Sequence, residues 1–126
     1  MKVPPARTTY RIVFETGDVL LGGTGANVFL SLAGSNGSSI DKRLETDEDT
    51  FVPASAVVFR VETQDMGDIE RIRVRHDNTG PNAGWFLHRV VITNELTGRE
   101  WVFNCDRWLA VDEDDGAIDR VLYPRV

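Results

Sequence analysis

Apolar and polar side chains alternate along most of this chain, and the alternation has a period of two residues. In the first such run, the apolar residues are Tyr10, Ile12 and Phe14. The polar residues Arg11 and Glu15 would point to the opposite face. The same alternation recurs over residues 28–32, 57–61, 72–74 and 101–105. Because successive side chains of a strand point to opposite faces of a sheet, each run predicts a strand with one buried face.

The run over residues 85–94 breaks this alternation once. Trp85 and Leu87 fall on odd positions, whereas Val90 and Ile92 fall on even positions. A β-bulge inserts one extra residue into a strand and moves the side chains that follow to the other face. A bulge near the middle of the run therefore predicts that all four apolar side chains point into one core.

Clusters of glycine, asparagine and aspartate separate the runs, at residues 16–18, 22–25, 34–37, 77–81 and 94–98. Such clusters favour turns. No stretch of useful length shows a convincing helical stripe. Seven or eight short strands joined by turns predict an all-β protein, an antiparallel β-sandwich. Residues 1–7 precede the first run and are expected to form a flexible arm or linker.

The composition is typical of one soluble domain, and the charge excludes some classes of partner. The 126 residues are 41% hydrophobic and 27% charged, which is ordinary for a single globular domain. Lys and Arg number 14 against 20 Asp and Glu, for a net charge of −6. A nucleic-acid partner is disfavoured because phosphate binding requires a positive surface. Simple attraction to anionic lipid is disfavoured for the same reason, which leaves cations as natural partners.

Signals for compartment and anchoring are few. Cys105 is the only cysteine, so it forms neither an internal disulfide nor a zinc cluster. The first residues lack the apolar segment of a signal peptide, and no stretch approaches the roughly 18 apolar residues of a membrane span. We expect a cytoplasmic protein that is peripheral to a membrane.

Motifs for catalysis and nucleotide binding fail at particular residues. The glycine-rich stretch 17–24 lacks the lysine of a phosphate-binding loop, because Gly23 stands in its place. His76 and His88 lie far apart in sequence and are expected at polar or edge positions, without the further ligands that zinc needs. The chain has neither a nucleophile elbow nor a recognisable cysteine–histidine signature. The protein is therefore not expected to be an enzyme.

Two acidic clusters remain, at residues 45–49 and 112–115. Gly116 follows the second cluster, as in a calcium-binding EF-hand loop. That alignment puts Val111 and Leu122 at the first and last ligand positions, where acidic side chains are required. The second cluster is therefore expected to be a solvated loop. The first could supply oxygen ligands for Ca²⁺, a hard cation, and the alternative is again a solvated loop.

Several motifs share their order and spacing with one known family. They are Tyr10-x-Ile12-x-Phe14, Gly22-Gly23-Thr24, His76-Asp77-Asn78-x-Gly80, Gly84-Trp85-Phe86-Leu87 and Trp101-x-Phe103-x-Cys105-x-x-Trp108-Leu109. Together they resemble the PLAT domain, the lipoxygenase-homology or LH2 β-sandwich, over residues 8–124. Residues 108–116 look most like the repeats of tandem-PLAT lipoxygenase-homology-domain proteins. The resemblance implies two four-stranded antiparallel sheets, as in C2-like domains, without catalytic machinery.

Many members of this family bind Ca²⁺ at one end of the sandwich. By resemblance, carbonyl groups and carboxylates would be the ligands here, from Gly23, Asp47, Asp49, Asp77 and Asn78. Leu21 and Gly25 stand where some members carry an acidic ligand, so this half of the site is short of charge. The alternative is that residues 77–80 form only a tight turn held by Asx hydrogen bonds.

Two further features suggest contact surfaces. Leu20 and Leu21 interrupt a polar loop beside the expected cation site. There the pair could enter a membrane shallowly while Ca²⁺ bridges to phosphate headgroups, unless one leucine caps the core. Arg71, Arg73 and Arg75 alternate along one strand. They predict either a docking surface for an acidic partner or a solvated face paired with nearby acids.

The function that follows is a non-catalytic PLAT module for Ca²⁺-assisted membrane association or scaffolding. Its expected partners are a membrane lipid surface or a membrane protein, and neighbouring PLAT repeats or an attached domain. One alternative is a protein–protein interaction repeat that binds neither lipid nor Ca²⁺. Another is the regulatory domain of a lipid-modifying enzyme. The three tryptophans are expected in the core, at Trp85, Trp101 and Trp108.

Overall fold

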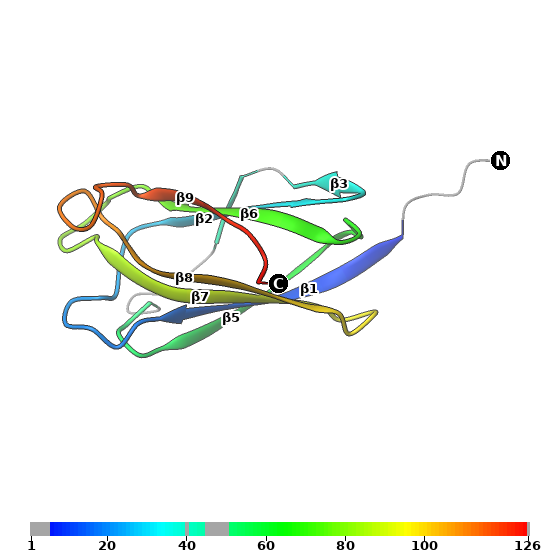
Figure 1. Ribbon diagram of the computed structural model, residues 1–126, viewed down its shortest axis with the longest axis horizontal. Coiled ribbons are helices and arrows are strands. Elements are labelled where there is room, and N and C mark those ends of the chain that lie inside the picture. Colours follow the sequence, from blue (N-terminus) through cyan, green and yellow to red (C-terminus); the bar gives the residue numbers. More distant parts are fainter. Residues whose placement is uncertain (1–5, 40, 45–50, 126) are drawn as a thin grey trace.

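Nine strands are formed by the residues that the computed structural model describes, 6–39, 41–44 and 51–125 (Figure 1). They are β1 (Arg7–Thr16), β2 (Val28–Gly34), β3 (Gly37–Ser38), β4 (Lys42–Arg43), β5 (Ala56–Gln64), β6 (Ile69–His76), β7 (Trp85–Asn94), β8 (Glu100–Leu109) and β9 (Asp119–Leu122). The five alternating runs and residues 85–94 all lie in strands, as the period of two predicts. Within the described ranges, no helix is long and apolar enough to cross a membrane.

The strands form two antiparallel sheets that face each other, as Figure 1 shows in side view. The first sheet has the order β5-β1-β7-β8, and the second has the order β3-β2-β6-β9 with β4 also paired to β2. The predicted antiparallel β-sandwich is confirmed. The second sheet has five strands rather than the four expected, because the two-residue strands β3 and β4 pair with different parts of β2.

Side chains from both sheets fill the space between them. Phe14 of β1 lies at the centre of an aromatic group, with its ring centroid 5.8 Å from that of Phe59 and 5.9 Å from those of Phe51 and Trp85. Burying a large apolar side chain contributes roughly 1.5–3 kcal/mol. The core therefore rests on the inward positions of the alternating runs.

The predicted bulge in β7 is confirmed. The pairing of β7 with β8 shifts register between Leu87 and Arg89, and the four apolar side chains on either side of the shift are all fully buried. Trp101 is also buried, as expected. Trp108 is half-buried, and its ring packs edge-on against that of Phe86, with centroids 5.5 Å apart.

The predicted arm, residues 1–7, falls largely outside the described residues, which begin at residue 6. Arg7 is already the first residue of β1, where it pairs with Gln64. Its guanidinium also forms an ion pair with Glu62 at 3.5 Å. The first strand therefore includes the last residue of the predicted arm.

Several loops meet at one end of the sandwich, on the left in Figure 1. They are the β1–β2 loop, the segment before β5, the β6–β7 loop and the β8–β9 loop. Backbone hydrogen bonds join the β1–β2 loop to its neighbours: Thr24 N donates to Phe51 O before β5 at 2.8 Å, and Phe86 N of β7 donates to Gly22 O at 2.8 Å. Among the described residues, this loop end holds five of the predicted site residues: Leu20, Leu21, Gly23, Asp77 and Asn78.

Candidate functional site

The β1–β2 loop is anchored near both of its ends. Gly17 N donates to Phe86 O at 2.9 Å. The Thr24 hydroxyl donates to Ala83 O at 2.7 Å and accepts a hydrogen bond from Ala26 N at 3.1 Å. Residues 18–21 protrude between these two anchors.

Gly23 lies directly against the segment that precedes β5. A Cβ atom at Gly23 would clash with the carbonyl oxygen of Phe51 and lie 2.9 Å from Val52 Cα. Only glycine allows this approach without a shift of backbone. At Gly25, by contrast, a Cβ atom would meet nothing within 4 Å. The loop is thus tightly packed at one predicted ligand position and open two residues later.

The predicted ligand Asp77 is held by four hydrogen bonds. Its Oδ1 accepts from Asn27 N and Thr79 N at 3.2 Å each and from Thr79 Oγ1 at 2.7 Å. Its Oδ2 accepts from Asn27 Nδ2 at 2.9 Å. Burial raises the pKa of Asp77, but the hydrogen bonds from Thr79 and Asn27 outweigh burial and lower the pKa to about 2. The Asx turn is therefore present, and it holds the carboxylate in its ionised form.

His76 is a core residue, so the expectation of a polar or edge position was wrong. Its side chain is buried, and its Nε2 donates to Leu109 O at 2.6 Å. Because a carbonyl only accepts, the proton is on Nε2, and Nδ1 accepts from Asn78 N at 3.0 Å. Burial lowers the pKa of His76, which favours this neutral form. Buried His76 thus fixes the backbone of Asn78, whose φ is 58°.

Asp47 and Asp49 lie outside the described residues, and so does the rest of the first acidic cluster. The residues on either side are described. Leu44 N donates to Val28 O at 2.8 Å, and Phe51 forms a β-bridge with Thr24. The two described residues that flank the acidic cluster, Leu44 and Phe51, therefore both lie beside the β1–β2 connection.

The described part of the site fits a cation only in part. Over the described ranges, no group of three or more His, Cys, Asp or Glu side chains could hold a metal ion. Asp77 supplies one ionised carboxylate, and it already accepts four hydrogen bonds. Ca²⁺ takes six to eight oxygen ligands. The described residues alone therefore do not complete a Ca²⁺ site.

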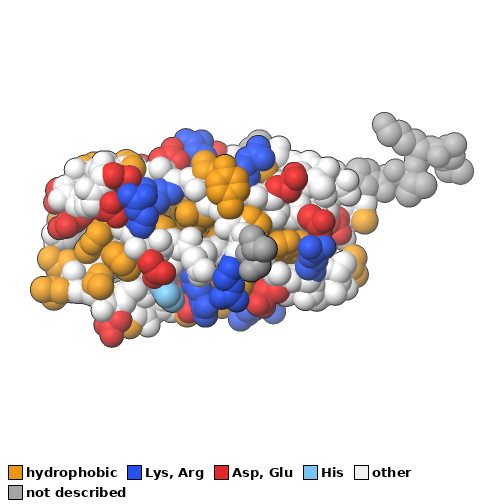
Figure 2. Space-filling model, in the orientation of Figure 1, with side chains coloured by type: hydrophobic (Ala, Val, Ile, Leu, Met, Phe, Trp, Pro, Cys, Tyr) orange, Lys and Arg blue, Asp and Glu red, His pale blue; other side chains and the backbone are white. Residues whose placement is uncertain are grey.

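Leu20 and Leu21 are the most prominent apolar feature of this end. Their exposed fractions are 88% and 61%, so neither leucine caps the core. Together with Val52 and Pro53 they line a groove of about 390 Å³. Figure 2 shows hydrophobic side chains gathered at the same end. Leu21 has a φ of 58°, a left-handed conformation that costs a residue with a Cβ roughly 1–2 kcal/mol.

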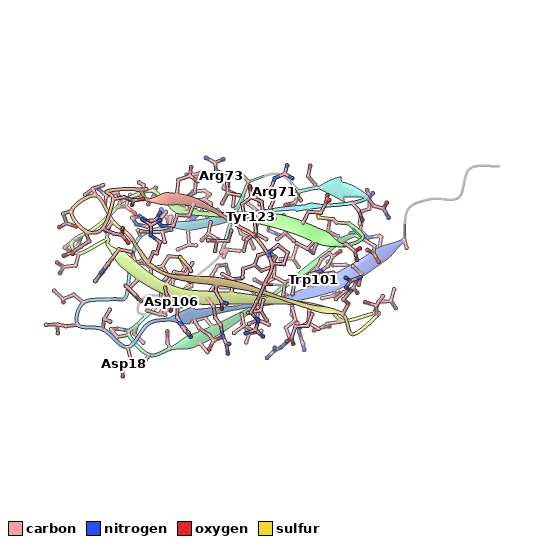
Figure 3. The ribbon with its side chains drawn as sticks, viewed as in Figure 1. Asp18, Arg71, Arg73, Trp101, Asp106 and Tyr123 are labelled. Carbon is pink, nitrogen blue, oxygen red and sulfur yellow. The ribbon has the colours of Figure 1, made fainter. Side chains whose placement is uncertain are left out.

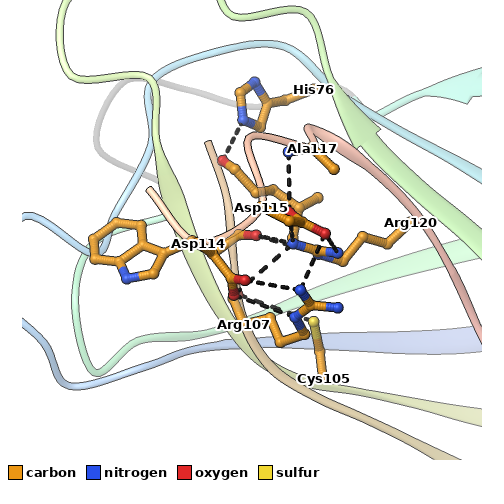
Figure 4. A network of polar contacts seen from close by, with 9 residues as sticks. His76, Cys105, Arg107, Asp114, Asp115, Ala117 and Arg120 are labelled. Carbon is orange, nitrogen blue, oxygen red and sulfur yellow. Dashed lines mark hydrogen bonds and ion pairs between the residues drawn. The ribbon is translucent and has the colours of Figure 1, made fainter. Parts of the chain in front are cut away.

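The second acidic cluster is only partly the solvated loop that was expected. Asp114 and Asp115 form ion pairs with Arg107 and Arg120 (Figure 4). Arg120 also donates to the carbonyl of Trp108, at 3.2 Å from Nε and 2.6 Å from Nη2. The hydrogen bond from Arg120 is the largest of several influences that lower the pKa of Asp115. This network holds the β8–β9 loop against the edge of the first sheet.

The three arginines of β6 differ in their surroundings. Arg73 donates from Nε to both carboxylate oxygens of Asp119, at 2.9 and 3.1 Å. Arg75 donates to Asp41 at 2.8 Å, and its guanidinium lies 3.9 Å over the ring of Phe29. Pairing with nearby acids thus accounts for two of the three. Arg71 is exposed and forms no ion pair within the described residues.

The amino-acid sequence is similar to part of several long proteins. A family profile described as the PLAT/LH2 domain matches residues 10–123. Lipoxygenase homology domain-containing protein 1 of mouse is 43% identical over 119 residues, which are 92% of this chain and 6% of that protein. The mouse polycystin family receptor for egg jelly is 40% identical over 105 residues, 82% of this chain and 5% of that protein. The chain spans a small fraction of these relatives.

Solved structures of lipoxygenases contain a similar domain. Coral 8R-lipoxygenase, described as calcium-activated via a C2-like domain, matches with a TM-score of 0.78 and 30% identity over 92% of this chain and 17% of that one. A calcium-dependent 11R-lipoxygenase matches with a TM-score of 0.56 and 28% identity, over 93% of this chain and 17% of that one. The alpha toxin of Clostridium absonum, at 15% identity and a TM-score of 0.66, shares the fold.

Proposed function

Since this chain belongs to the PLAT/LH2 domain family, we propose that it is a non-catalytic module for Ca²⁺-assisted association with membranes. The similarity to a lipoxygenase that is activated by calcium via a C2-like domain supports the proposal. In this proposal the domain is peripheral to the membrane and acts on the cytoplasmic side, where anionic lipids concentrate. Any chemistry would come from a partner or an attached domain.

One observation carries the proposal: two adjacent leucines stand exposed at the tip of the β1–β2 loop. Exposing two leucine side chains to water is unfavourable. The left-handed backbone conformation of Leu21 adds a further cost in conformational free energy. Insertion into lipid would remove both side chains from water, at roughly 1.5–3 kcal/mol for each leucine that is fully buried. The groove beside them, lined by Val52 and Pro53, would widen the apolar contact.

Ca²⁺ would supply the positive charge that the domain lacks. Its proposed ligands are the ionised carboxylate of Asp77, the carbonyl groups of Gly23 and Asn78, and the carboxylates of Asp47 and Asp49. The net charge of −6 opposes approach to anionic headgroups, and a bound divalent cation reverses the local sign. His76 and Asn27 act in support, because they hold Asn78 and Asp77 in place through hydrogen bonds.

Co-sedimentation with phosphatidylserine vesicles tests the proposal. The protein should sediment with vesicles in Ca²⁺ and stay in solution with chelator. The double variant Leu20→Ser/Leu21→Asn should weaken binding by at least about tenfold, and asparagine tolerates the left-handed conformation at position 21. Leu96→Ser is the matched control, because Leu96 is 68% exposed in the turn between β7 and β8, far from the site.

A thermal-shift measurement without vesicles separates metal binding from lipid binding. Ca²⁺ should raise the melting temperature of the wild-type protein, since a ligand of the folded state stabilises it. Asp77→Ala should remove this rise, whereas the leucine variant should keep it. Vesicle binding that is the same in Ca²⁺ and in chelator, or that is unaffected by the leucine changes, would rule out the proposed function.

A further inference from the structure

The outer face of the second sheet carries a hollow beside Arg71. In the register of the sheet, Ala33 of β2 lies between Arg71 of β6 and Ser38 of β3. Neighbouring strands are about 4.8 Å apart, so Arg71 and Ser38 face each other across roughly 10 Å, with only a methyl group between them. The hollow has a volume of about 230 Å³. Its lining is completed by Ser31, Leu32, Ser39, Ile72, Arg73 and Val121.

Hydrogen-bond donors dominate this hollow. Ser39 Oγ accepts from Leu32 N at 2.8 Å, which leaves its hydroxyl proton free to donate. Arg73 uses Nε and Nη2 for Asp119, so its Nη1 remains available. The guanidinium of Arg71 adds a planar fork of N–H groups, a geometry that matches phosphate oxygens.

No carboxylate of the described residues lines the hollow, although two arginines do. Of the carboxylates described near this face, Asp41 and Asp119 are already bound to Arg75 and Arg73. Glu70, the residue before Arg71, is exposed and does not line the hollow. In the described part of the chain, Arg71 has neither an ion pair nor a side-chain hydrogen bond. An anion placed above Ala33 would therefore meet donors on two sides, with no carboxylate among the described residues that line the hollow.

An exposed aromatic side chain flanks the same hollow. Tyr123 follows β9 and is 66% exposed. Leu122 of β9 pairs with Ile72 of β6, which brings the next residue, Tyr123, near Arg71. Figure 3 labels both residues in the same region, and Figure 2 shows hydrophobic and basic side chains there. Tyrosine and arginine are enriched among the residues that dominate protein–protein binding energy. The surroundings thus suit an anion carried by a protein.

We propose that this hollow binds a phosphate monoester group on a protein partner, as on a phosphorylated side chain. Arg71 would bind the phosphate through its fork, Ser38 and Ser39 would donate from the opposite side, and Tyr123 would contact the adjoining chain. Arg71 precedes His76 by five residues of β6, a distance of about 17 Å from the loop end. If the loop end enters lipid as proposed above, this face remains in water and is accessible to a soluble partner.

Titration of the ¹⁵N-labelled protein with inorganic phosphate and then O-phospho-L-serine tests the proposal. The NMR experiment uses constant ionic strength and neither Ca²⁺ nor vesicles, so its outcome is independent of the proposed membrane function. Both ligands should give saturable shifts of the Ala33, Ser38 and Arg71 amides. Arg71→Gln should weaken binding at least about tenfold, and Ala33→Leu should do the same by filling the hollow without changing charge.

Arg11→Gln is the matched control, because Arg11 is an exposed arginine on a strand of the other sheet. This variant should bind both ligands as the wild type does. Shifts that do not saturate, or that are equal in wild type and Arg71→Gln, would overturn the proposal. A second experiment tests a lipid source of the phosphate. It measures co-sedimentation of the protein, in the presence of chelator, with vesicles that contain a phosphatidylinositol phosphate. Binding to them that requires Arg71, without binding of either soluble phosphate, would assign the hollow to lipid instead.

Discussion

Arg120 has the least exposed side chain of all the ion-paired residues in the described ranges, and its replacement is expected to destabilise the fold. Its side chain is 9% exposed, and it donates both to the Trp108 carbonyl and to the two oxygens of Asp115 (Figure 4). Replacing it with methionine keeps much of the apolar stem but removes every donor. The Trp108 carbonyl then loses two hydrogen bonds from a charged group, and the β8–β9 loop loses its attachment to the sheet.

The size of the expected destabilisation follows mainly from the hydrogen bonds that the partly buried Trp108 carbonyl loses. An acceptor left without its charged donor costs about 1–3 kcal/mol of unfolding free energy. The ion pair with Asp115 adds less, because that carboxylate is largely in contact with solvent. For a urea m-value of about 1–3 kcal/mol/M, Arg120→Met should lower the unfolding midpoint by roughly 1 M.

Arg107 provides the matched control for this measurement. It contacts the same two aspartates, Asp114 and Asp115, but is 46% exposed and does not bind the Trp108 carbonyl. Arg107→Met should therefore shift the urea midpoint much less. Equal shifts for the two variants would show that the carboxylate pairs, and not the carbonyl contacts of Arg120, stabilise the loop, and the reasoning would be refuted.

Three further predictions concern the loop end. Because the pKa of Asp77 is lowered to about 2, its stabilising contribution is complete above about pH 4 and is lost as the pH falls toward 2. Asp77→Asn should thus be less stable at pH 7 in urea, and a gap that persists unchanged at pH 2 would contradict this. Gly25→Asp should raise the Ca²⁺ affinity measured by calorimetry, since the position is open and gains a carboxylate. Gly23→Ala should lower this affinity by displacing the Phe51 segment, and an unchanged affinity would exclude Gly23 from the site.

Much of the fold follows from the period of two. The alternation at Tyr10, Ile12 and Phe14 predicts β1, and the change of parity after Leu87 locates the bulge in β7. Strands β3 and β4 contain two residues each, too few to show any period. They form because β2 offers a free edge, a consequence of sheet assembly that no local pattern contains.

Less of the candidate site than of the fold could be predicted from the sequence. Asp77 and the two leucines could be placed in loops, because turn residues surround them. His76 could have been assigned correctly, since it continues the inward series of Ile72 and Val74 along β6. The pairing of Asp114 and Asp115 with Arg120 depends on how β9 returns beside β6, and spacing along the chain does not report that return.

The aromatic core has a practical consequence at its contact with the acidic segment. Phe51 is the first described residue after that segment, and its ring centroid lies 4.9 Å from that of Trp85. Any displacement of the chain at Phe51 changes the environment of a buried indole, whose Nε1 donates to Thr16 Oγ1 at 2.9 Å. The domain thus contains an intrinsic fluorophore next to its proposed metal loop. Once Trp101 and Trp108 are replaced by phenylalanine, the emission of Trp85 alone gives an optical readout of events in that loop, without any attached dye.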